Sequence, residues 1–119
     1  MDALTVEATT IDLAEQGVRA LNAELHGAGG ENAATSYEVL HPEGAHAVAA
    51  GIDTDITVEV RGHVGYYCAG MNDGGRVTVH GNAATGLAEN MMSGTVRVTG
   101  DASQSAGATA HGGLLVIEG

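Results

Sequence analysis

Residues 74–86, GGRVTVHGNAATG, place a short valine-rich run between glycines, and the same arrangement returns farther along the chain. Two sets of glycines recur at intervals of nineteen residues: Gly62, Gly81, Gly100 and Gly119, and Gly75, Gly94 and Gly113. A register held over several steps indicates a repeat protein, in which each repeat stacks on the next. The glycines therefore indicate architecture rather than a phosphate-binding loop, which needs a Lys and a Ser or Thr after the last glycine.

Hydrophobic and polar residues alternate in four short runs between the glycines: ITVEV at 56–60, RVTV at 76–79, TVRV at 95–98 and LLVI at 114–117. A period of two indicates a strand with one buried face. The buried positions form two columns: Val58, Val77, Val96 and Leu115, and Val60, Val79, Val98 and Ile117. Stacked at the roughly 4.8 Å spacing of neighbouring strands, these columns would make a continuous aliphatic spine.

The glycines on both sides of each run predict the corners of a coil. A corner needs a positive φ or a close approach of two backbones, and glycine supplies either without steric cost. The predicted structural turns are Gly62, Gly65, Gly75, Gly81, Gly94, Gly100 and Gly113. Small residues between the glycine sets would form a second wall opposite the strands: Cys68, Leu87 and Ala106, with Ala69, Ala88 and Gly107.

Together these patterns predict an all-β fold, a right-handed parallel β-helix with turns of about nineteen residues. The chain lacks both the leucine-rich repeat signature and the six-residue period of a left-handed hexapeptide coil. Residues 37–55 predict an imperfect earlier turn. The nineteen-residue step aligns two pairs there: Tyr37 with Ile56, and Val39 with Val58. Pro42 and Gly44 interrupt this register, and Pro42 suits a corner because it has no N–H for a strand ladder.

The N-terminal segment has a helical pattern instead. In residues 9–27, TTIDLAEQGVRALNAELHG, apolar side chains recur at helical spacing: Ile11, Ala14, Val18, Leu21 and Leu25. Thr9 and Asp12 could form a capping box, and Gly27 could end the helix. The apolar face predicts a short helix that caps or flanks the first turn. We therefore divide the chain into a helix with its connector, residues 1–36, and the β-helix repeats, residues 37–119.

Charge and composition exclude several classes of partner. Four Lys and Arg residues against fifteen Asp and Glu give a net charge of −11, which argues against nucleic acid and anionic membranes, since both bind basic surfaces. The chain has no Phe and no Trp, so its core must be thin enough for small side chains to meet. A single cysteine excludes an intrachain disulfide, and no signal peptide or long apolar stretch is present. These features predict a cytoplasmic protein.

The candidate chemical motifs all lack residues that their chemistry needs. GNAATG at 81–86 has only the glycine spacing of a P-loop, and GHVG at 62–65 resembles a KH loop without basic surroundings. The six histidines show no metal-ligand spacing: His26, His41, His46, His63, His80 and His111. Cys68 is expected to pack as a small buried side chain rather than to act as a nucleophile.

Two further sets of residues remain as weaker candidates. Four acids could form a cleft like that of a β-helical enzyme acting on a polymeric sugar, although no convergent base is evident: Asp53, Asp55, Glu59 and Asp73. Three methionines are expected to be adaptable fillers or contact residues: Met71, Met91 and Met92. We therefore predict no catalytic, cofactor-binding or metal-binding residue in this chain.

The sequence VRGHVGYYCAGMNDGG, residues 60–75, resembles the GXGXG domain at the C-terminal end of the large subunit of glutamate synthase. This resemblance implies a right-handed parallel β-helix with a structural role and no catalytic residues of its own. Nearly the whole chain is more similar still to the free-standing GXGXG subunits of N-methylglutamate synthase (methylamine–glutamate N-methyltransferase). The most specific stretches are AENMMSG, 88–94, and DASQSAGAT, 101–109, because stacked repeats do not demand those residues.

The resemblance implies a three-part enzyme that makes N-methylglutamate from methylamine and glutamate with release of ammonia. One partner would resemble a glutamine amidotransferase, and the other a glutamate synthase core that carries FMN and an iron–sulfur cluster. This chain would hold the two in place as a structural subunit without a cofactor of its own. The alternatives are a structural subunit of another glutamate synthase or formylmethanofuran dehydrogenase-type complex, or a stand-alone, self-associating β-helix module.

The last turn departs from the pattern of the others. Leu114 and Val116 occupy outward positions that hold Thr, Arg or Glu in earlier turns. The resemblance implies that relatives continue for several more turns, whereas this chain stops at Gly119, a repeat boundary. An open strand edge beside an apolar outer face is an association surface. We therefore expect Leu114 and Val116 to contact another chain, in a homo-oligomer through the open C-terminal turn or in a truncated form of a longer subunit.

Overall fold

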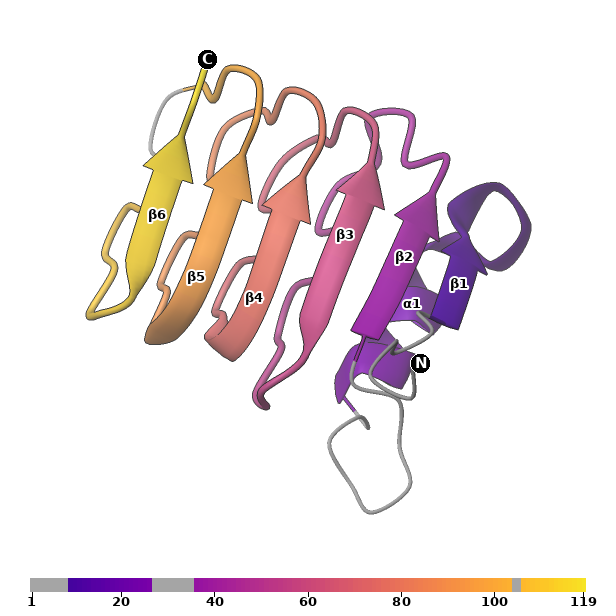
Figure 1. Ribbon diagram of the computed structural model, residues 1–119, viewed down its shortest axis with the longest axis horizontal. Helices are drawn as coiled ribbons and strands as arrows, with labels where there is room; N and C mark the ends of the chain where they lie inside the picture. Colours follow the sequence, from indigo (N-terminus) through magenta and orange to yellow (C-terminus); the bar gives the residue numbers. More distant parts are fainter. Residues whose placement is uncertain (1–8, 27–35, 104–105) are drawn as a thin grey trace, which may run out of the picture.

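The computed structural model describes residues 9–26, 36–103 and 106–119, which form a parallel sheet wound into a solenoid (Figure 1). The six strands lie in chain order: β1 (Thr9–Asp12), β2 (Ser36–Leu40), β3 (Thr57–Arg61), β4 (Asp73–Val79), β5 (Ser93–Val98) and β6 (Leu114–Ile117). In Figure 1 all strands run in the same direction, and the connections between β2 and β5 pass behind the sheet before the next strand begins, which makes the coil right-handed. The predicted fold class is confirmed.

The registers of β3 to β6 are those that the sequence predicts. Val58 pairs with Val77, which pairs with Val96, and Val60 begins a second column in the same way. The valines of both columns are buried, and each contributes about 1.5–3 kcal/mol relative to an exposed side chain. A single coil could not bury both sides of its valines, so the coils stabilise one another.

Small residues form the second wall, on the side of the core opposite the sheet. Cys68 and Leu87 are fully buried there, as are Ala69 and Ala88 in the neighbouring column. Parallel bridges join successive coils within the wall: Val64 with Ala83, and Ala83 with Ala102. The prediction of a second wall of small side chains is confirmed.

The predicted register of the earlier turn is wrong by two residues. Tyr37 and Val39 pair with Val58 and Val60, whereas the nineteen-residue step had placed Ile56 opposite Tyr37. A shift of two residues keeps every side chain on its face of the sheet. Tyr37 and Val39 are therefore buried, as an inward position requires.

The two extra residues lie in the connection that follows β2. Leu40 pairs with Arg61 and Thr57 pairs with Arg76, so the step between paired residues is two residues longer from β2 to β3 than from β3 to β4. This connection begins with the sequence HPEG at 41–44, in which two non-glycine residues have a positive φ. The corner with Pro42 thus takes a wider path than the later corners do.

The predicted helix begins four residues late. Residues Thr9–Asp12 form β1, and Ile11 pairs with Val39 as part of the sheet, so it does not belong to the apolar face of the helix. The helix α1 spans Leu13–His26. Four residues of alternation are too few to separate a strand from the first turn of a helix when the helical pattern continues downstream.

The start of α1 also differs from the predicted capping box. Asp12 alone is the N-cap, because its Oδ1 accepts a hydrogen bond from the backbone N–H of Ala14 at 2.9 Å. Gly17 has a φ of 82°, which is not helical, so α1 is two helical pieces joined at a kink. The predicted end at Gly27 lies outside the described residues.

The helix covers the N-terminal end of the core, behind β1 and β2 in Figure 1. Leu21 and Leu25 are fully buried against the core. The side-chain amide of Asn22 donates a hydrogen bond to the backbone carbonyl of Ala47 at 2.8 Å, which ties α1 to the second wall. The prediction that the helix caps the first turns is confirmed.

Candidate functional site

The glycines predicted as structural turns lie where successive coils come close. All but Gly65 lie within two residues of a strand end: Gly62, Gly75, Gly81, Gly94, Gly100 and Gly113. A Cβ at Gly81 would lie 2.7 Å from the backbone carbonyl of Gly62, and Gly94 has a φ of 96°. Gly65 follows a bridge residue, and a Cβ there would collide with the ring of His46. At these positions a side chain would collide with a neighbouring residue or would be strained by a positive φ.

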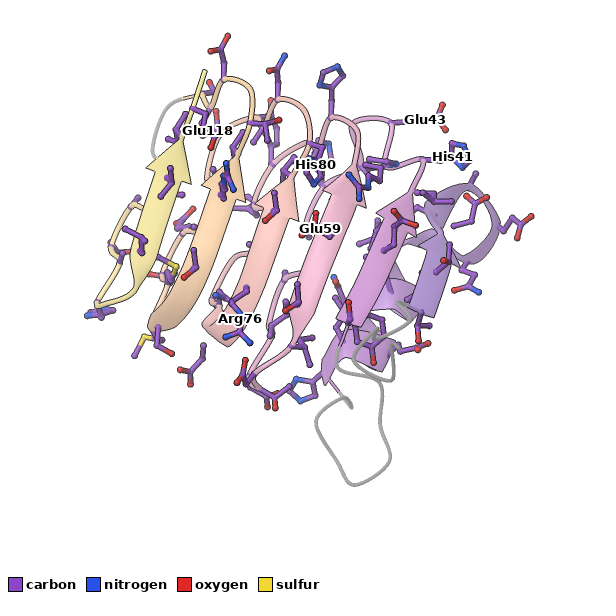
Figure 2. All side chains as sticks on the ribbon, viewed as in Figure 1. His41, Glu43, Glu59, Arg76, His80 and Glu118 are labelled. Carbon is purple, nitrogen blue, oxygen red and sulfur yellow. The ribbon has the colours of Figure 1, made fainter. Side chains whose placement is uncertain are left out.

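A chain of alternating charges crosses the outer face of the sheet, where Figure 2 labels Glu59 and His80. Arg61 Nε donates to Glu38 Oε2 at 3.0 Å, and Arg61 Nη2 lies 4.0 Å from Glu59 Oε1. His80 Nε2 donates to the same oxygen of Glu59 at 2.5 Å. Because no described hydroxyl or thiol hydrogen-bonds to His80, the pair lacks the nucleophile of a catalytic triad and acts as a cross-strand contact.

Two further arginines on the sheet are also paired. Arg76 Nη2 lies 2.7 Å from Asp55 Oδ1, and Arg97 Nε donates to Glu118 Oε2 at 2.6 Å. These pairs are solvent-exposed, so each contributes about 1 kcal/mol at most. Three of the four arginines are thus engaged with carboxylates in the described part of the chain.

The four acids considered as a cleft do not converge. Asp55 and Glu59 pair with basic residues on the sheet, as described above, while Asp53 lies 3.7 Å from His26 Nδ1. Asp73 accepts a hydrogen bond from the hydroxyl of Ser93 at 2.8 Å. No group of three or more His, Cys, Asp or Glu residues in the described part of the chain could hold a metal ion.

His41 and Asp12 form a pair beside the start of α1. His41 Nδ1 donates to Asp12 Oδ1 at 3.0 Å. This hydrogen bond lowers the pKa of Asp12 and raises the pKa of His41, because it favours the charged form of each. The pair ties the wide corner after β2 to the N-cap of the helix.

Cys68 lies within the core of the second wall. Its side chain is fully buried, and this burial raises the pKa of the thiol to about 12. The thiolate is the nucleophilic form of cysteine, so Cys68 is almost entirely unreactive at neutral pH. The interpretation of Cys68 as a packed side chain is confirmed.

A groove of about 370 Å³ lies on the outer side of the second wall. It is lined by Ala47, Ala50, Tyr67, Gly70, Met71, Glu89 and Asn90, which come from three successive connections of the solenoid. The side chains of Tyr67 and Met71 are 52% and 59% exposed. Of the three methionines expected to be fillers or contact residues, Met91 is buried in the core, whereas Met71 and Met92 are exposed.

Sequence reasoning did not single out this groove, although one signal for it was present. The backbone N–H of Ala47 donates to the carbonyl of Tyr66, and that of Tyr67 donates to the carbonyl of Thr85. Tyr67 therefore lies level with Ala47 of the preceding coil and Gly86 of the following coil. The neighbouring positions of this column hold an alanine and a glycine, so core packing does not account for a tyrosine here. The sequence does not indicate that this ring is exposed, nor that the backbone at this position is left-handed, with a φ of 61°.

The predicted interface residues lie on the edge strand of the described sheet. Leu114 and Val116 pair with Thr95 and Arg97, so both occupy the outer face, as the sequence predicts. Leu114 is 56% exposed and Val116 is partly buried. Ile117, an inward residue, is also 44% exposed because no described strand lies beyond β6.

In the described part of the chain, no helix is long and apolar enough to cross a membrane. No protein-family model matches this sequence, and no solved structure matches it. The chain is similar to Protein GlxC of Rhizobium meliloti (strain 1021), with 62% identity over 86 residues, or 72% of this chain. The matched residues make up 38% of that relative, so the chain spans less than half the length of the curated relative it matches.

Proposed function

We propose that this chain is a non-catalytic structural subunit of a glutamate-synthase-like complex that makes N-methylglutamate from methylamine and glutamate in the cytoplasm. The observation that carries the proposal is the stacked nineteen-residue coil, built with the sequence pattern that resembles GXGXG subunits. Residues 88–94 and 101–109 support it further, because the coil itself does not require their sequences.

A solenoid of this kind suits a spacer role. Its valine columns hold successive coils in one register, so surfaces at its two ends and on its second wall keep fixed positions. The proposed partners are an amidotransferase-like subunit and a glutamate-synthase-like subunit, which would approach from different sides. In this role the chain positions reacting modules and does not contact the substrate.

The cofactors of such a complex, FMN and an iron–sulfur cluster, would belong to the glutamate-synthase-like partner. Iron–sulfur clusters are held mainly by several cysteine thiolates. This chain has one cysteine, and its thiol is fully buried with a pKa raised to about 12. The residues present therefore do not fit a cluster.

Reconstitution tests the proposal directly. The two candidate partner subunits are mixed with and without this chain, and glutamate-dependent methylamine consumption and co-elution are measured. We expect both to require the chain, while the chain alone consumes no methylamine. Equal assembly and turnover without the chain would remove the proposed role.

The exposed edge of β6 favours a second candidate function, self-association. Leu114 and Ile117 are exposed there on the outermost strand of the described sheet, and an exposed edge strand promotes strand addition. Light scattering on the purified chain, with a Leu114→Glu variant as control, distinguishes the two functions. A stable dimer of the unaltered chain that the variant loses would support self-association, whereas a monomer that binds the partner subunits would support the structural subunit. Equivalent tests with subunits of formylmethanofuran dehydrogenase-type complexes address the remaining alternative.

A further inference from the structure

The groove on the second wall places an aromatic ring and a carboxylate side by side above a floor of small residues. A Cβ at Gly86 would lie 2.7 Å from Cδ1 of Tyr67 and 3.2 Å from Oε2 of Glu89. The ring and the carboxylate therefore flank the same glycine. Ala47 and Ala50 also line the groove, so the aliphatic stem of a side chain that enters it can pack on their methyl groups.

The ring of Tyr67 is displayed at a cost to the backbone. A left-handed conformation costs a non-glycine residue about 1–3 kcal/mol, and it is rare for bulky residues. The coil requires this conformation at the position, since Ala47 and Gly86 also have positive φ values of 58° and 85°. The coil does not require an aromatic ring there, because Ala47 and Gly86 have none. The ring thus contributes an exposed apolar surface.

Glu89 gives the groove a negative charge. No described basic side chain forms an ion pair with Glu89, which is partly buried. A guanidinium or ammonium group is attracted both to a carboxylate and to the face of an aromatic ring, and its aliphatic stem packs on apolar surface. The net charge of −11 also favours a basic partner.

The apolar surface continues beyond the groove. Tyr66 stacks on His46 with ring centroids 4.7 Å apart, and it stands edge-on to Tyr67 at 6.5 Å. The Tyr66 side chain is about half exposed. A small free cation would leave this surface in water, whereas a polypeptide that presents a basic side chain would cover it.

We propose that this groove docks an arginine or lysine side chain presented by a partner polypeptide. Glu89 pairs with the charge, Tyr67 covers the cation and its stem, and Ala47 and Ala50 form the floor. This inference goes beyond the proposed function, because it holds for whichever complex the partner belongs to.

Peptide titration tests the groove on the intact chain. The probes are acetyl-Gly-Arg-Gly-amide and its citrulline counterpart, which keeps the shape and removes the charge, and the readout is the backbone amide NMR shifts. We expect the arginine peptide to shift the amides of Tyr67, Met71 and Glu89 saturably at millimolar concentration. The citrulline peptide should bind at least fivefold more weakly. Absence of saturable shifts, or equal binding of both peptides, would overturn the proposal.

Variants locate the site and identify the occupant. Glu89→Gln and Tyr67→Ala should each weaken binding of the arginine peptide at least fivefold, and alanine is accepted by the fold because Ala47 occupies the same column. Glu43→Gln, at an exposed corner outside the groove, should bind like the unaltered chain. Unchanged binding in Glu89→Gln would refute the assignment. Methylguanidinium binding as tightly as the peptide would refute the polypeptide occupant in favour of a small cation.

The same variants separate this proposal from the proposed function. Peptide binding is measured without partner subunits, so it can succeed when reconstitution fails. If the chain assembles with the subunits but the groove binds no arginine peptide, the docking proposal fails and the structural role remains.

Discussion

The two ends of the described solenoid differ in how far their core residues are covered, although the same hydrophobic columns run through both. At the N-terminal end α1 lies against the core, and Leu21 and Leu25 have no exposed surface. At the C-terminal end Ile117 continues a column of fully buried valines, yet it is 44% exposed. The burial of a residue in this fold therefore depends on the next layer as much as on its own coil.

A helix is suited to close a solenoid because its backbone hydrogen bonds are made internally. It covers the apolar end of the core without offering a new strand edge. The backbone carbonyls of the wall beneath it still need donors, and α1 supplies side chains for two of them. Asn22 donates to the carbonyl of Ala47 at 2.8 Å, and His26 Nδ1 donates to that of Gly51 at 3.3 Å. The edge of β6 has no such cover among the described residues.

The largest expected effect comes from a matched pair of leucines at the two ends. Leu21→Ala should lower the free energy of unfolding by about 2–5 kcal/mol, since it leaves a cavity beneath α1. Leu114→Ala, on the exposed edge, should change it by about 0.5 kcal/mol or less. Urea denaturation followed by circular dichroism measures both. Equal losses for the two variants would mean that the ends are covered alike in solution.

A methyl group between coils should have an intermediate effect. Gly81→Ala places a Cβ 2.7 Å from the backbone of Gly62, which cannot move independently of its coil, so we expect a loss of about 1–3 kcal/mol. Gly70→Ala is the control, because the nearest atom, the carbonyl oxygen of Tyr67, is 3.3 Å away. The loss at Gly70 should be less than half that at Gly81 in the same denaturation assay. The reverse order would show that coil-to-coil contact does not limit this corner.

The smallest expected effect is the pH dependence of the pair that closes the N-terminal end. The pKa of His41 is raised, so its contribution to stability is complete below the unfolded value of about 6.5 and is lost as pH rises through the raised pKa. The pKa of Asp12 is lowered, so its contribution is complete above about 3.8 and is lost as pH falls through the lowered pKa. The pair should therefore stabilise the fold most between about pH 3.8 and 6.5.

An imidazole titration by NMR measures this pair directly. The midpoint of His41 should lie above 6.5 and should fall in Asp12→Asn, which removes the negative charge but keeps a good N-cap for α1. A midpoint that stays unchanged in Asp12→Asn would contradict the assigned cause.

The repeats were predictable because each step of the pattern specifies the same contact. The alternation at Val77 and Val79 sets the buried face, and the glycine interval sets the register with the next strand. Where the interval changes, this reasoning fails, as at Val39, whose partner lies two residues beyond the predicted one. Ile11 was assigned to the helix because an apolar residue fits a short strand and a helix equally well.

The sequence by itself determined the coil, its buried columns, its second wall and the acidic character of its surface. These follow from local period and composition, which act within each repeat. Only the tertiary structure decided which residues from different coils meet on a surface. Tyr67 and Glu89 are distant in sequence, and they flank the same glycine because successive coils stack. The backbone of Tyr67 also has a positive φ, which a tyrosine in the sequence does not indicate. Exposure at β6 likewise depends on what lies beyond the strand, which no pattern within the strand can specify.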